Sequence, residues 1–301
     1  MIQYPYLGRM GYGDALRLQE ELVALRQQGR IENVLLLLEH PPVLTLGRNA
    51  KRSNVLASDE MLKARGVTLH EINRGGDVTY HGPGQLIGYP IFDLRSLRNA
   101  SGGRLGPVDF VRMMEEALIR LCGAYGVAAG RICGLTGVWC NPAGAARGTA
   151  PHGNSLEEGC GSGRAGDAGR ATAGGKIAAI GIHVSRGVTS HGFALNVSTD
   201  LNDFRLINPC GITDRPVTSL DREVAQPGAL PGLETIAHQA ARQFGLVFGE
   251  QVLALESLAA LRALAKTPPS PEIDFPAQDR PLEVPPEVER LRNPKDRPVN
   301  A

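Results

Sequence analysis

Two side chains in the sequence, a lysine and a cysteine, could together carry out acyl transfer. Lys176 follows two glycines at the start of an alternating segment, and Cys210 lies in the segment NPCGI at 208–212. A free thiol of pKa about 8.5 is largely protonated at neutral pH, and a neighbouring ammonium lowers that pKa. The resulting thiolate attacks acyl groups and also leaves readily, which suits thioester exchange. Taken singly, Lys176 is more typical of a solvated surface charge, and Cys210 of a small structural side chain.

A glycine-rich polar loop is the second candidate for function. It reads RGGDVTYHGPGQ over 74–85 and follows a predicted strand. Glycine lets the backbone approach a ligand closely, and clustered Arg, Tyr, His and Gln side chains are typical of a pocket wall. The loop lacks the ending of a P-loop and the G-x-G-x-x-G pattern of dinucleotide-binding proteins. A turn-rich hairpin with a hydrogen-bonded histidine is the alternative interpretation.

The other cysteines and histidines give weaker signals. A zinc site would have to use residues without any C-x-x-C pair, namely Cys133, Cys140, His152 and Cys160. We therefore predict no metal site. His183 and His191 border the lysine segment and could line a cleft, although ordinary turn or surface positions fit them equally well.

The composition fits an enzyme-sized globular protein. The 301 residues carry 32 Lys and Arg against 31 Asp and Glu, and 42% are hydrophobic. This charge balance gives no support to nucleic-acid binding. The longest aliphatic run, 34–38, is far shorter than the roughly 20 residues of a membrane helix, and no secretory signal is visible at 1–13. Five cysteines argue against a disulfide scaffold, so we expect a cytoplasmic protein.

Two segments stand apart from the rest by composition. Residues 141–175 contain ten glycines and eight alanines, and residues 267–301 contain nine prolines. Neither can bury enough apolar surface to offset the entropy lost on ordering. We predict a catalytic domain over 1–266 with a flexible insertion at 141–175, followed by a disordered proline-rich tail over 267–301.

The remaining segments predict helices and strands that would position the candidate side chains. Helices are expected over 14–28, 107–125, 233–244 and 251–264, the first capped by Asp14. Strands are expected over 33–39, 43–46, 67–72, 87–92, 177–185 and 192–197. Because helices flank runs of strands without a regular βαβ rhythm, the expected fold class is α+β, with a mixed or antiparallel sheet flanked by helices.

Five segments, in order along the chain, resemble the octanoyltransferases, or lipoyl(octanoyl) transferases, of lipoate biosynthesis. The first two read EHPPVLTLGR over 39–48 and RGGDVTYHGPGQLIGY over 74–89. The others read GKIAAIG over 175–181, GFALNV over 192–197 and NPCGI over 208–212. The similarity covers about residues 1–140 and 174–246. Five motifs in the right order are far more specific than any one of them.

The resemblance implies a single catalytic domain of the lipoate and biotin protein ligase type. It implies that Cys210 carries a transient acyl thioester and that Lys176 tunes the thiol. It also implies an acyl-binding pocket formed by three segments, whose residues are Arg74, Gly75, Gly76, Asp77, Val78, Thr79, Tyr80 and His81, then Ala179, Ile180 and Gly181, then Gly192, Phe193 and Ala194. No cofactor and no metal is implied.

The resemblance also implies the partners. The donor would be octanoyl-acyl carrier protein, and the acceptor a specific lysine on the lipoyl domain of a 2-oxoacid dehydrogenase complex or on the glycine-cleavage H protein. No ATP is required, because transfer from a thioester to an amine is downhill. We expect a monomer that binds neither nucleic acid nor membrane. Arg48, Arg74 and Arg104 are expected to form a basic rim for the acidic carrier protein.

Three other functions stay open. An ATP-dependent lipoate or biotin ligase would use Lys176 to bind an adenylate and would leave Cys210 idle. A cysteine hydrolase would pair Cys210 with His81, His183 or His191. A binding module without chemistry would need neither Lys176 nor Cys210. The insertion and the tail lie outside the pattern of the octanoyltransferases, and the insertion, which stops just short of Lys176, either gates access or is inert.

Overall fold

The computed structural model describes residues 1–98, 102–140, 174–208, 216–226 and 228–265. All of them belong to the first of two units into which the chain divides, Met1–Ala265. The predicted tail, Cys210, and the predicted insertion except for Gly174 and Gly175 lie outside the described residues. The domain boundary at 266 therefore stays a prediction.

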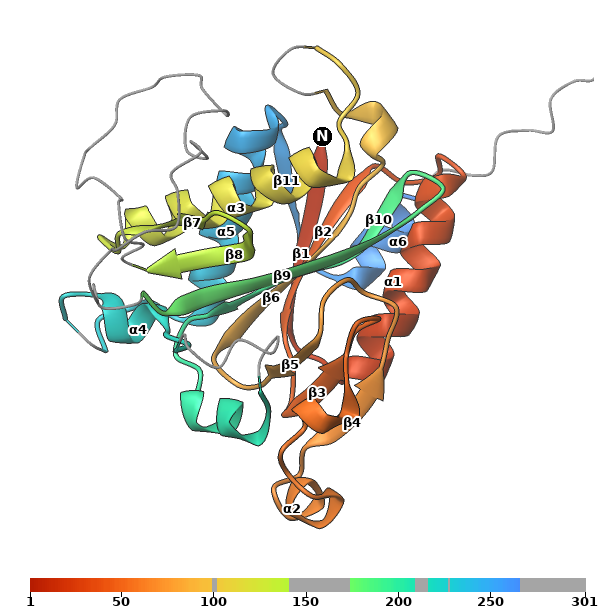
Figure 1. Cartoon of the computed structure of the whole chain (residues 1–301). Coiled ribbons are helices and arrows are strands. Elements are labelled where there is room, and N and C mark those ends of the chain that lie inside the picture. Colours follow the sequence, from red (N-terminus) through yellow and green to blue (C-terminus); the bar gives the residue numbers. More distant parts are fainter. Residues whose placement is uncertain (99–101, 141–173, 209–215, 227, 266–301) are drawn as a thin grey trace, which may run out of the picture. The chain divides into compact units, whose positions relative to one another are not determined.

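An eight-stranded mixed sheet forms the centre of the fold (Figure 1). Its strands are β1 (Ile2–Arg9), β2 (Asn33–Glu39), β6 (Gln85–Ile91), β7 (Ala129–Ile132), β8 (Leu135–Cys140), β9 (Lys176–Ser185), β10 (Val188–Asn196) and β11 (Val252–Leu255). Their order is β11-β1-β2-β6-β10-β9-β8-β7. β1 pairs in parallel with β11 and β2, and the other neighbouring pairs are antiparallel. Of the two predicted alternatives, a mixed or an antiparallel sheet, the structure has the mixed one.

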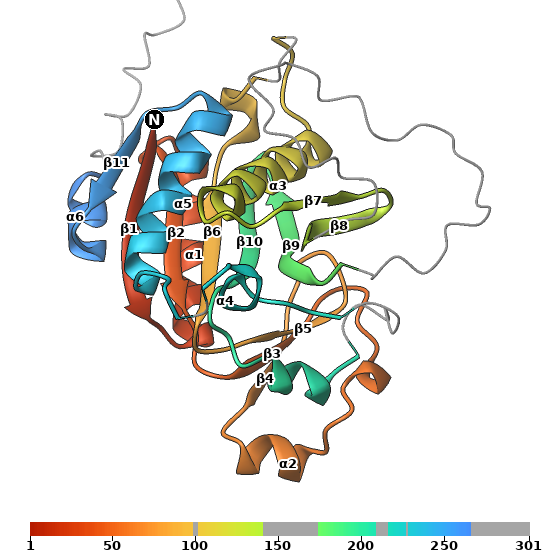
Figure 2. The same ribbon diagram turned by 90° about the vertical axis from the view of Figure 1, so that its left-hand side faces the viewer.

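Helices cover both faces of this sheet. Figure 2 shows α3 (Pro107–Ala124) and α5 (Leu233–Phe248) side by side on one face, and α1 (Tyr12–Gln27) on the other. The short α6 (Leu258–Ala263) shares the core of α1. α3 begins where Pro107 fixes the first helical position and Asp109 accepts the N–H of Gly106 at 3.3 Å. The expected α+β class with flanking helices is thus confirmed.

The aliphatic run of β2 is buried on both sides because the sheet has a core on each face. Leu35 and Leu37 pack toward α3 and α5, whereas Val34, Leu36 and Leu38 pack toward α1. Side chains alternate between the faces of a strand, so a central strand covered twice must be apolar at every position. This explains why the segment shows a continuous hydrophobic run and not an alternating pattern.

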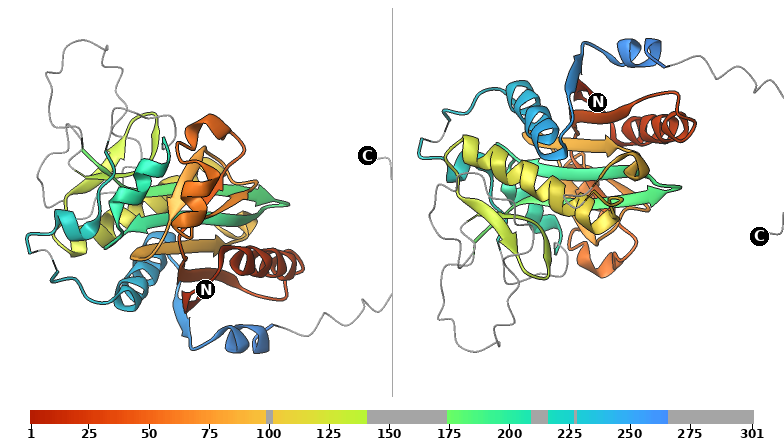
Figure 3. Two further views of the ribbon diagram at one scale, coloured as in Figure 1. Left: turned by 90° about the horizontal axis from the view of Figure 1, so that it is seen from below. Right: turned by 90° about the horizontal axis from the view of Figure 1, so that it is seen from above.

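A smaller three-stranded sheet joins the large one through the loop of interest. It contains β3 (Val43–Leu46), β4 (Thr68–Glu71) and β5 (Val78–His81), in the order β4-β3-β5. Its core includes side chains of α2 (Asp59–Ala64) and of the 3-10 helix η3 (Leu201–Leu206), and the short helix η1 (Arg52–Asn54) directly precedes the core residue Val55. The orange segment around α2 and the green segment around η3 lie side by side in Figure 3, joined by a bridge between Val55 and Ile207.

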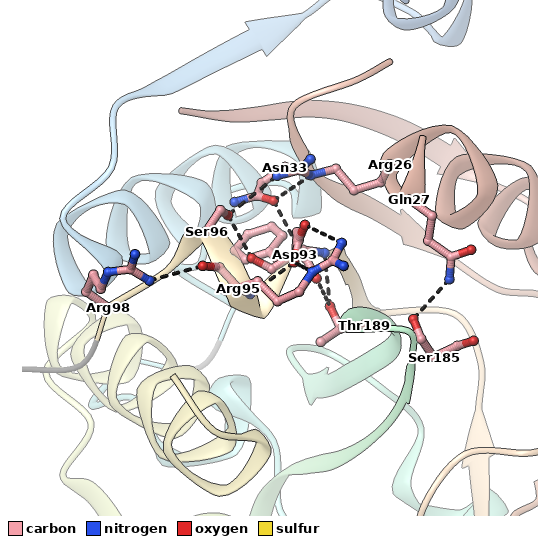
Figure 4. Close-up of polar contacts among 10 residues, drawn as sticks. Arg26, Gln27, Asn33, Asp93, Arg95, Ser96, Arg98, Ser185 and Thr189 are labelled. Carbon is pink, nitrogen blue, oxygen red and sulfur yellow. Dashed lines mark hydrogen bonds and ion pairs between the residues drawn. The ribbon is translucent and has the colours of Figure 1, made fainter. Parts of the chain in front are cut away.

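A polar network fixes the end of the large sheet where β2 begins and β6 ends (Figure 4). Asn33 Oδ1 accepts hydrogen bonds from Arg26 Nε at 3.0 Å and from the backbone N–H of Asp93 at 2.9 Å. Thr189 Oγ1 donates to the carbonyl of Pro90 at 2.6 Å, which ties β10 to β6. Because buried polar groups need partners, this network sets the register of the strands that carry the candidate site.

The structure corrects two expectations about elements. Residues 251–264, expected as one helix, form strand β11 and helix α6, separated by Ser257, which caps α6 by accepting the N–H of Ala260 at 3.1 Å. Pairing of β11 with β1 decides in favour of a strand, because the apolar residues VLAL fit either element locally. Helix α1 begins at Tyr12 after Gly11, so Asp14 lies in its first turn and is not its cap. The short helices η2 (Leu94–Ser96) and α4 (Leu220–Glu223) complete the described elements.

Candidate functional site

Strands β9 and β10 bring two of the three predicted pocket segments together. Residues 179–181 pair in antiparallel register with 192–194, so that Gly181 lies opposite Gly192. The ring of Phe193 packs in the core and stacks on Phe244 at 5.5 Å between centroids. Phe193 therefore contributes its side chain to the core, and the absence of a side chain at Gly192 allows the close approach of the Gly88 carbonyl oxygen, with which a Cβ at 192 would clash.

The third segment, the loop that begins at Arg74, lies directly on β9. The N–H of Gly75 donates to the carbonyl of Ile182 at 3.1 Å. A Cβ on Gly181 would come within 2.7 Å of the Gly75 carbonyl oxygen, so only glycine allows this approach. On its other side, the loop receives a hydrogen bond from the N–H of Arg48 to the carbonyl of Arg74 at 3.1 Å. The fold thus places all three segments side by side.

Arg74 is buried, which corrects the expectation that it belongs to an exposed basic rim. Its side chain donates from Nη2 to Thr45 O at 2.8 Å and to Thr45 Oγ1 at 3.0 Å, and from Nη1 to Gly75 O at 2.9 Å. Its exposed fraction is 9%, whereas Arg48 and Arg104 are exposed. A buried guanidinium with these partners fixes the loop against β3 and supplies a positive charge beneath it.

A chain of hydrogen bonds, all donated in one direction, runs from Arg74 through His81 to the strand of Lys176. Thr45 Oγ1 accepts from Arg74 and lies 3.5 Å from His81 Nε2, and His81 Nδ1 donates to Gln85 Oε1 at 2.8 Å. Gln85 Nε2 then donates to Asn196 Oδ1 at 2.8 Å.

The second half of this series of hydrogen bonds ends on the backbone of the candidate lysine. Asn196 Nδ2 donates to the carbonyl of Thr218 at 2.9 Å, and the N–H of Thr218 donates to the carbonyl of Lys176 at 2.9 Å. Each buried side chain in this series has a hydrogen-bond partner, so the series of hydrogen bonds fixes the position of the loop relative to the lysine strand. Gln85 was expected in a pocket wall, whereas Asn196 and Thr218 were not assigned roles from the sequence, although Asn196 lies in one of its motifs.

His81 and His40 form a buried aromatic cluster with Tyr12 and Tyr89. His40 Nδ1 donates to the carbonyl of Met10 at 2.7 Å, and its Nε2 accepts from the Tyr89 hydroxyl at 2.7 Å. The Tyr12 ring stacks on His81 at 6.2 Å and tilts against His40 at 5.1 Å. Burial lowers the pKa of His40 to about 4 and that of His81 to about 3, so both imidazoles are neutral near pH 7.

Of the two histidines that flank the lysine segment, His191 is the buried one. Its Nε2 donates to Asn73 Oδ1 at 2.7 Å, and its backbone N–H donates to Gln19 Oε1 at 2.7 Å. Its φ of 56° lies in the left-handed region, and burial lowers its pKa to about 4. His191 therefore ties β10 to α1 and to the residue that precedes Arg74.

The second half of the segment 74–81, which forms strand β5 from Val78 onward, is held by partners away from β9. Asp77 Oδ2 accepts from Asn54 Nδ2 at 2.6 Å, and Tyr80 donates its hydroxyl hydrogen to Asp203 Oδ2 at 2.7 Å. Val78 and Tyr80 are buried in the core of the small sheet. These residues of the predicted pocket therefore contribute their side chains to the framework of the loop.

Lys176 begins β9 and is held by the backbone on two sides. It pairs with Trp139 of β8, and its N–H donates to the carbonyl of Pro216 at 2.9 Å. Its Nζ lies 4.9 Å from the centroid of the Trp139 ring. Pro216 is the first described residue after the segment 209–215 that contains Cys210.

The residues before Cys210 are also anchored near the loop. The N–H of Asn208 donates to the carbonyl of Asn54 at 2.7 Å, and Asn54 in turn holds Asp77 of the loop. Cys210 itself lies outside the described residues. Both ends of its segment are thus attached to the site, one beside the loop and the other at Lys176.

Other classes of site find little support in the part of the chain that the structure describes. Among these residues no group of three or more His, Cys, Asp or Glu could hold a metal ion. Cys122 and Cys140 are free and buried, and burial raises the pKa of both thiols, that of Cys122 to about 12. No helix in the described ranges is long and apolar enough to cross a membrane.

Comparison with known protein families gives a match over most of the chain. Residues 11–244 match the family described as the lipoyl protein ligase A/B catalytic domain. An octanoyltransferase from Acidobacterium capsulatum is 59% identical over 84% of this chain and 92% of its own length. An octanoyltransferase from Koribacter versatilis is 49% identical over 92% of this chain and 94% of its own length.

Solved structures share the fold at low sequence identity. A bi-partite lipoate protein ligase from Thermoplasma acidophilum has a TM-score of 0.57 and 15% identity, covering 87% of this chain and 89% of its own. A lipoate-protein ligase A bound with ATP gives the same TM-score and identity over 88% of this chain and 93% of its own. These likenesses confirm the predicted ligase-type fold.

Proposed function

Because the chain belongs to the octanoyltransferases, within the lipoyl protein ligase A/B catalytic domain family, we propose that it transfers an octanoyl group through a thioester on Cys210. It is thus an acyltransferase of lipoate biosynthesis. The observation that supports this mechanism best is the attachment of both flanks of the Cys210 segment to the candidate site, at Asn54 and at Lys176.

The first step moves the acyl group from the donor to the enzyme. The Cys210 thiolate adds to the carbonyl carbon of octanoyl-acyl carrier protein, and the bond between that carbon and the sulfur of the carrier breaks. The departing thiolate takes a proton from the Lys176 ammonium, which becomes a neutral amine. Before this step, the ammonium favours the thiolate form of Cys210 by charge attraction.

The second step moves the acyl group to the acceptor. The amine of a lysine on a lipoyl domain attacks the Cys210 thioester, forming an amide bond and releasing the Cys210 thiolate. The proton lost by the attacking nitrogen passes to Lys176, which restores the starting state. The acceptors we propose are lipoyl domains of 2-oxoacid dehydrogenase complexes and the glycine-cleavage H protein.

The proposed acyl site is the junction of the loop 74–81 with residues 179–181 and 192–194. Its support is the direct packing of Gly75 on Gly181 and the pairing of Gly181 with Gly192. The buried Arg74 places a positive charge under this junction. The proposed contacts of the acyl group are therefore backbone atoms beside these glycines, with the fixed side chains of Arg74 and His81 behind them.

A transfer assay separates this function from its alternatives. The protein is incubated with octanoyl-acyl carrier protein and a lipoyl domain without ATP, and octanoylated domain is measured by intact mass. We expect transfer by the native protein and by the C122A control, and loss of transfer in C210S and K176M. Full transfer by C210S would refute the mechanism, a strict ATP requirement would indicate a ligase, and free octanoate as the main product would indicate a hydrolase.

A further inference from the structure

Trp139 lies against the side chain of the candidate lysine. It pairs across the strands with Lys176, and its ring centroid is 4.9 Å from Lys176 Nζ. The indole is 1% exposed and is the only tryptophan of the chain. An ammonium over a desolvated indole face is attracted by the ring quadrupole, and a neutral amine is attracted much less. The contact therefore favours the charged form of Lys176.

Gly137, two residues before Trp139, leaves the space that the lysine side chain occupies. Its φ is 121°, and a Cβ there would lie 2.6 Å from the carbonyl oxygen of Ala178 and 3.1 Å from Lys176 Cε. A side chain at this position would push the lysine off the indole ring. Gly137 thus leaves room for the Lys176 side chain, and Trp139 provides the surface on which that side chain packs.

A buried carboxylate on α3 holds Gly137 of β8 in place. Glu115 Oε1 accepts the N–H of Gly137 at 3.0 Å, and Glu115 Oε2 pairs with Arg112 at 2.7 Å and with Arg131 at 3.1 Å. Glu115 is fully buried. Its charge is balanced by the two arginines, so the carboxylate fixes Gly137 of β8 against α3 and β7.

We propose that Trp139 is the positioning residue of Lys176 and sets the reactivity of Cys210 through it. The indole keeps the lysine charged and in one place at the start of β9, and the charge in turn favours the Cys210 thiolate. This inference rests on the proposed role of Lys176 in the transfer reaction. Trp139 itself is buried against the lysine and acts without contacting the acyl group.

A double-mutant cycle on thiol reactivity tests the inference. The rate of alkylation of Cys210 by iodoacetamide at pH 7 is measured by peptide mass spectrometry in the native protein, W139L, W139F, K176M and W139L/K176M. We expect W139L to react about tenfold more slowly, the factor equivalent to ~1.4 kcal/mol of lost cation–π attraction, and W139F to recover most of the rate. In the K176M background, W139L should have no further effect.

Two controls separate positioning from loss of structure. Phe110→Leu also shortens a fully buried aromatic side chain of the core, and it should lower stability without slowing alkylation of Cys210. The fluorescence of the single tryptophan should differ between the native protein and K176M, because Nζ lies over the ring.

The outcomes distinguish this inference from the proposed function. Alkylation of W139L at the native rate, with K176M slow, would overturn the role of Trp139 and leave the proposed function intact. Identical tryptophan emission in the native protein and K176M would also overturn it. A native rate of alkylation in K176M would overturn the proposed role of Lys176 and this inference together.

Discussion

Substitution of Gly181 by alanine tests whether the loop must lie directly on β9. The added Cβ would lie 2.7 Å from the Gly75 oxygen, and ordinary contacts begin at 3.4 Å, so the loop must move away by the difference of about 0.7 Å. Overpacking of this kind costs ~1–3 kcal/mol, and the reduced freedom of the unfolded chain returns ~0.4–1 kcal/mol. We expect a net loss of ~1–2 kcal/mol in the free energy of unfolding.

Gly181→Ala should lower the rate of octanoyl transfer clearly even though it lowers the free energy of unfolding only slightly. A displacement of ~1 Å in a positioned group can lower a rate by about 100-fold, so a shift of this size should reduce kcat/KM for the acyl donor about tenfold or more. Urea unfolding and the transfer assay give the two quantities on the same preparation. The protein should stay folded at 25 °C, because the loss is a fraction of the ~5–15 kcal/mol typical of a domain.

Gly123→Ala is the matched control for this substitution. Gly123 lies in the last turn of α3 with no atom within 4 Å of its added Cβ. Alanine there should raise stability by ~0.5–1 kcal/mol and leave transfer unchanged. Native activity in Gly181→Ala, despite the expected loss of stability, would refute the inference that the contact between the loop and β9 shapes the acyl site.

Three further predictions concern the buried polar groups. Asn196→Asp should lose ~1–3 kcal/mol of stability in urea unfolding, because it replaces the donor to Thr218 with an acceptor; no change would mean that the chain of hydrogen bonds is not formed. Tyr80→Phe should lose ~1 kcal/mol with transfer retained, and a larger loss of transfer would assign the hydroxyl a direct role. Between pH 6.5 and about 4 the free energy of unfolding should fall on acidification, because burial keeps the pKa of His40 at about 4 in the folded protein, while the unfolded chain binds the proton at higher pH. Urea titrations should show a shallower fall for His40→Asn. A fall equal to that of the native protein would contradict this cause.

The sequence predicted best those elements whose pattern follows from local packing. The run of β2 is apolar throughout because both faces are covered, and its bounds match the prediction of 33–39. The segment 251–264 was mistaken for one helix, because only the pairing of β11 with β1 distinguishes the two structures. Local periodicity carries no information on such a distant partner.

In the candidate site, too, the sequence predicted residues but not their contacts with distant parts of the chain. Gly75 and Gly181 were predicted as pocket residues, but their mutual contact depends on the register between loop and strand. Asn196 gives no signal of its own within its motif, and its place between Gln85 and Thr218 depends on the tertiary structure. Arg74 was expected in a basic rim for the carrier protein, and its burial reflects partners supplied by Thr45.

The most direct test of the covalent mechanism is the mass of the enzyme during the half-reaction. The native protein is mixed with octanoyl-acyl carrier protein in the absence of any acceptor, quenched in acid, and analysed intact and by peptide mapping. We expect one octanoyl group per chain, located on the peptide that contains Cys210 and removed by hydroxylamine, with accumulation strongly slowed in K176M. An unmodified Cys210 in a preparation that still transfers an octanoyl group to a lipoyl domain would contradict the covalent mechanism.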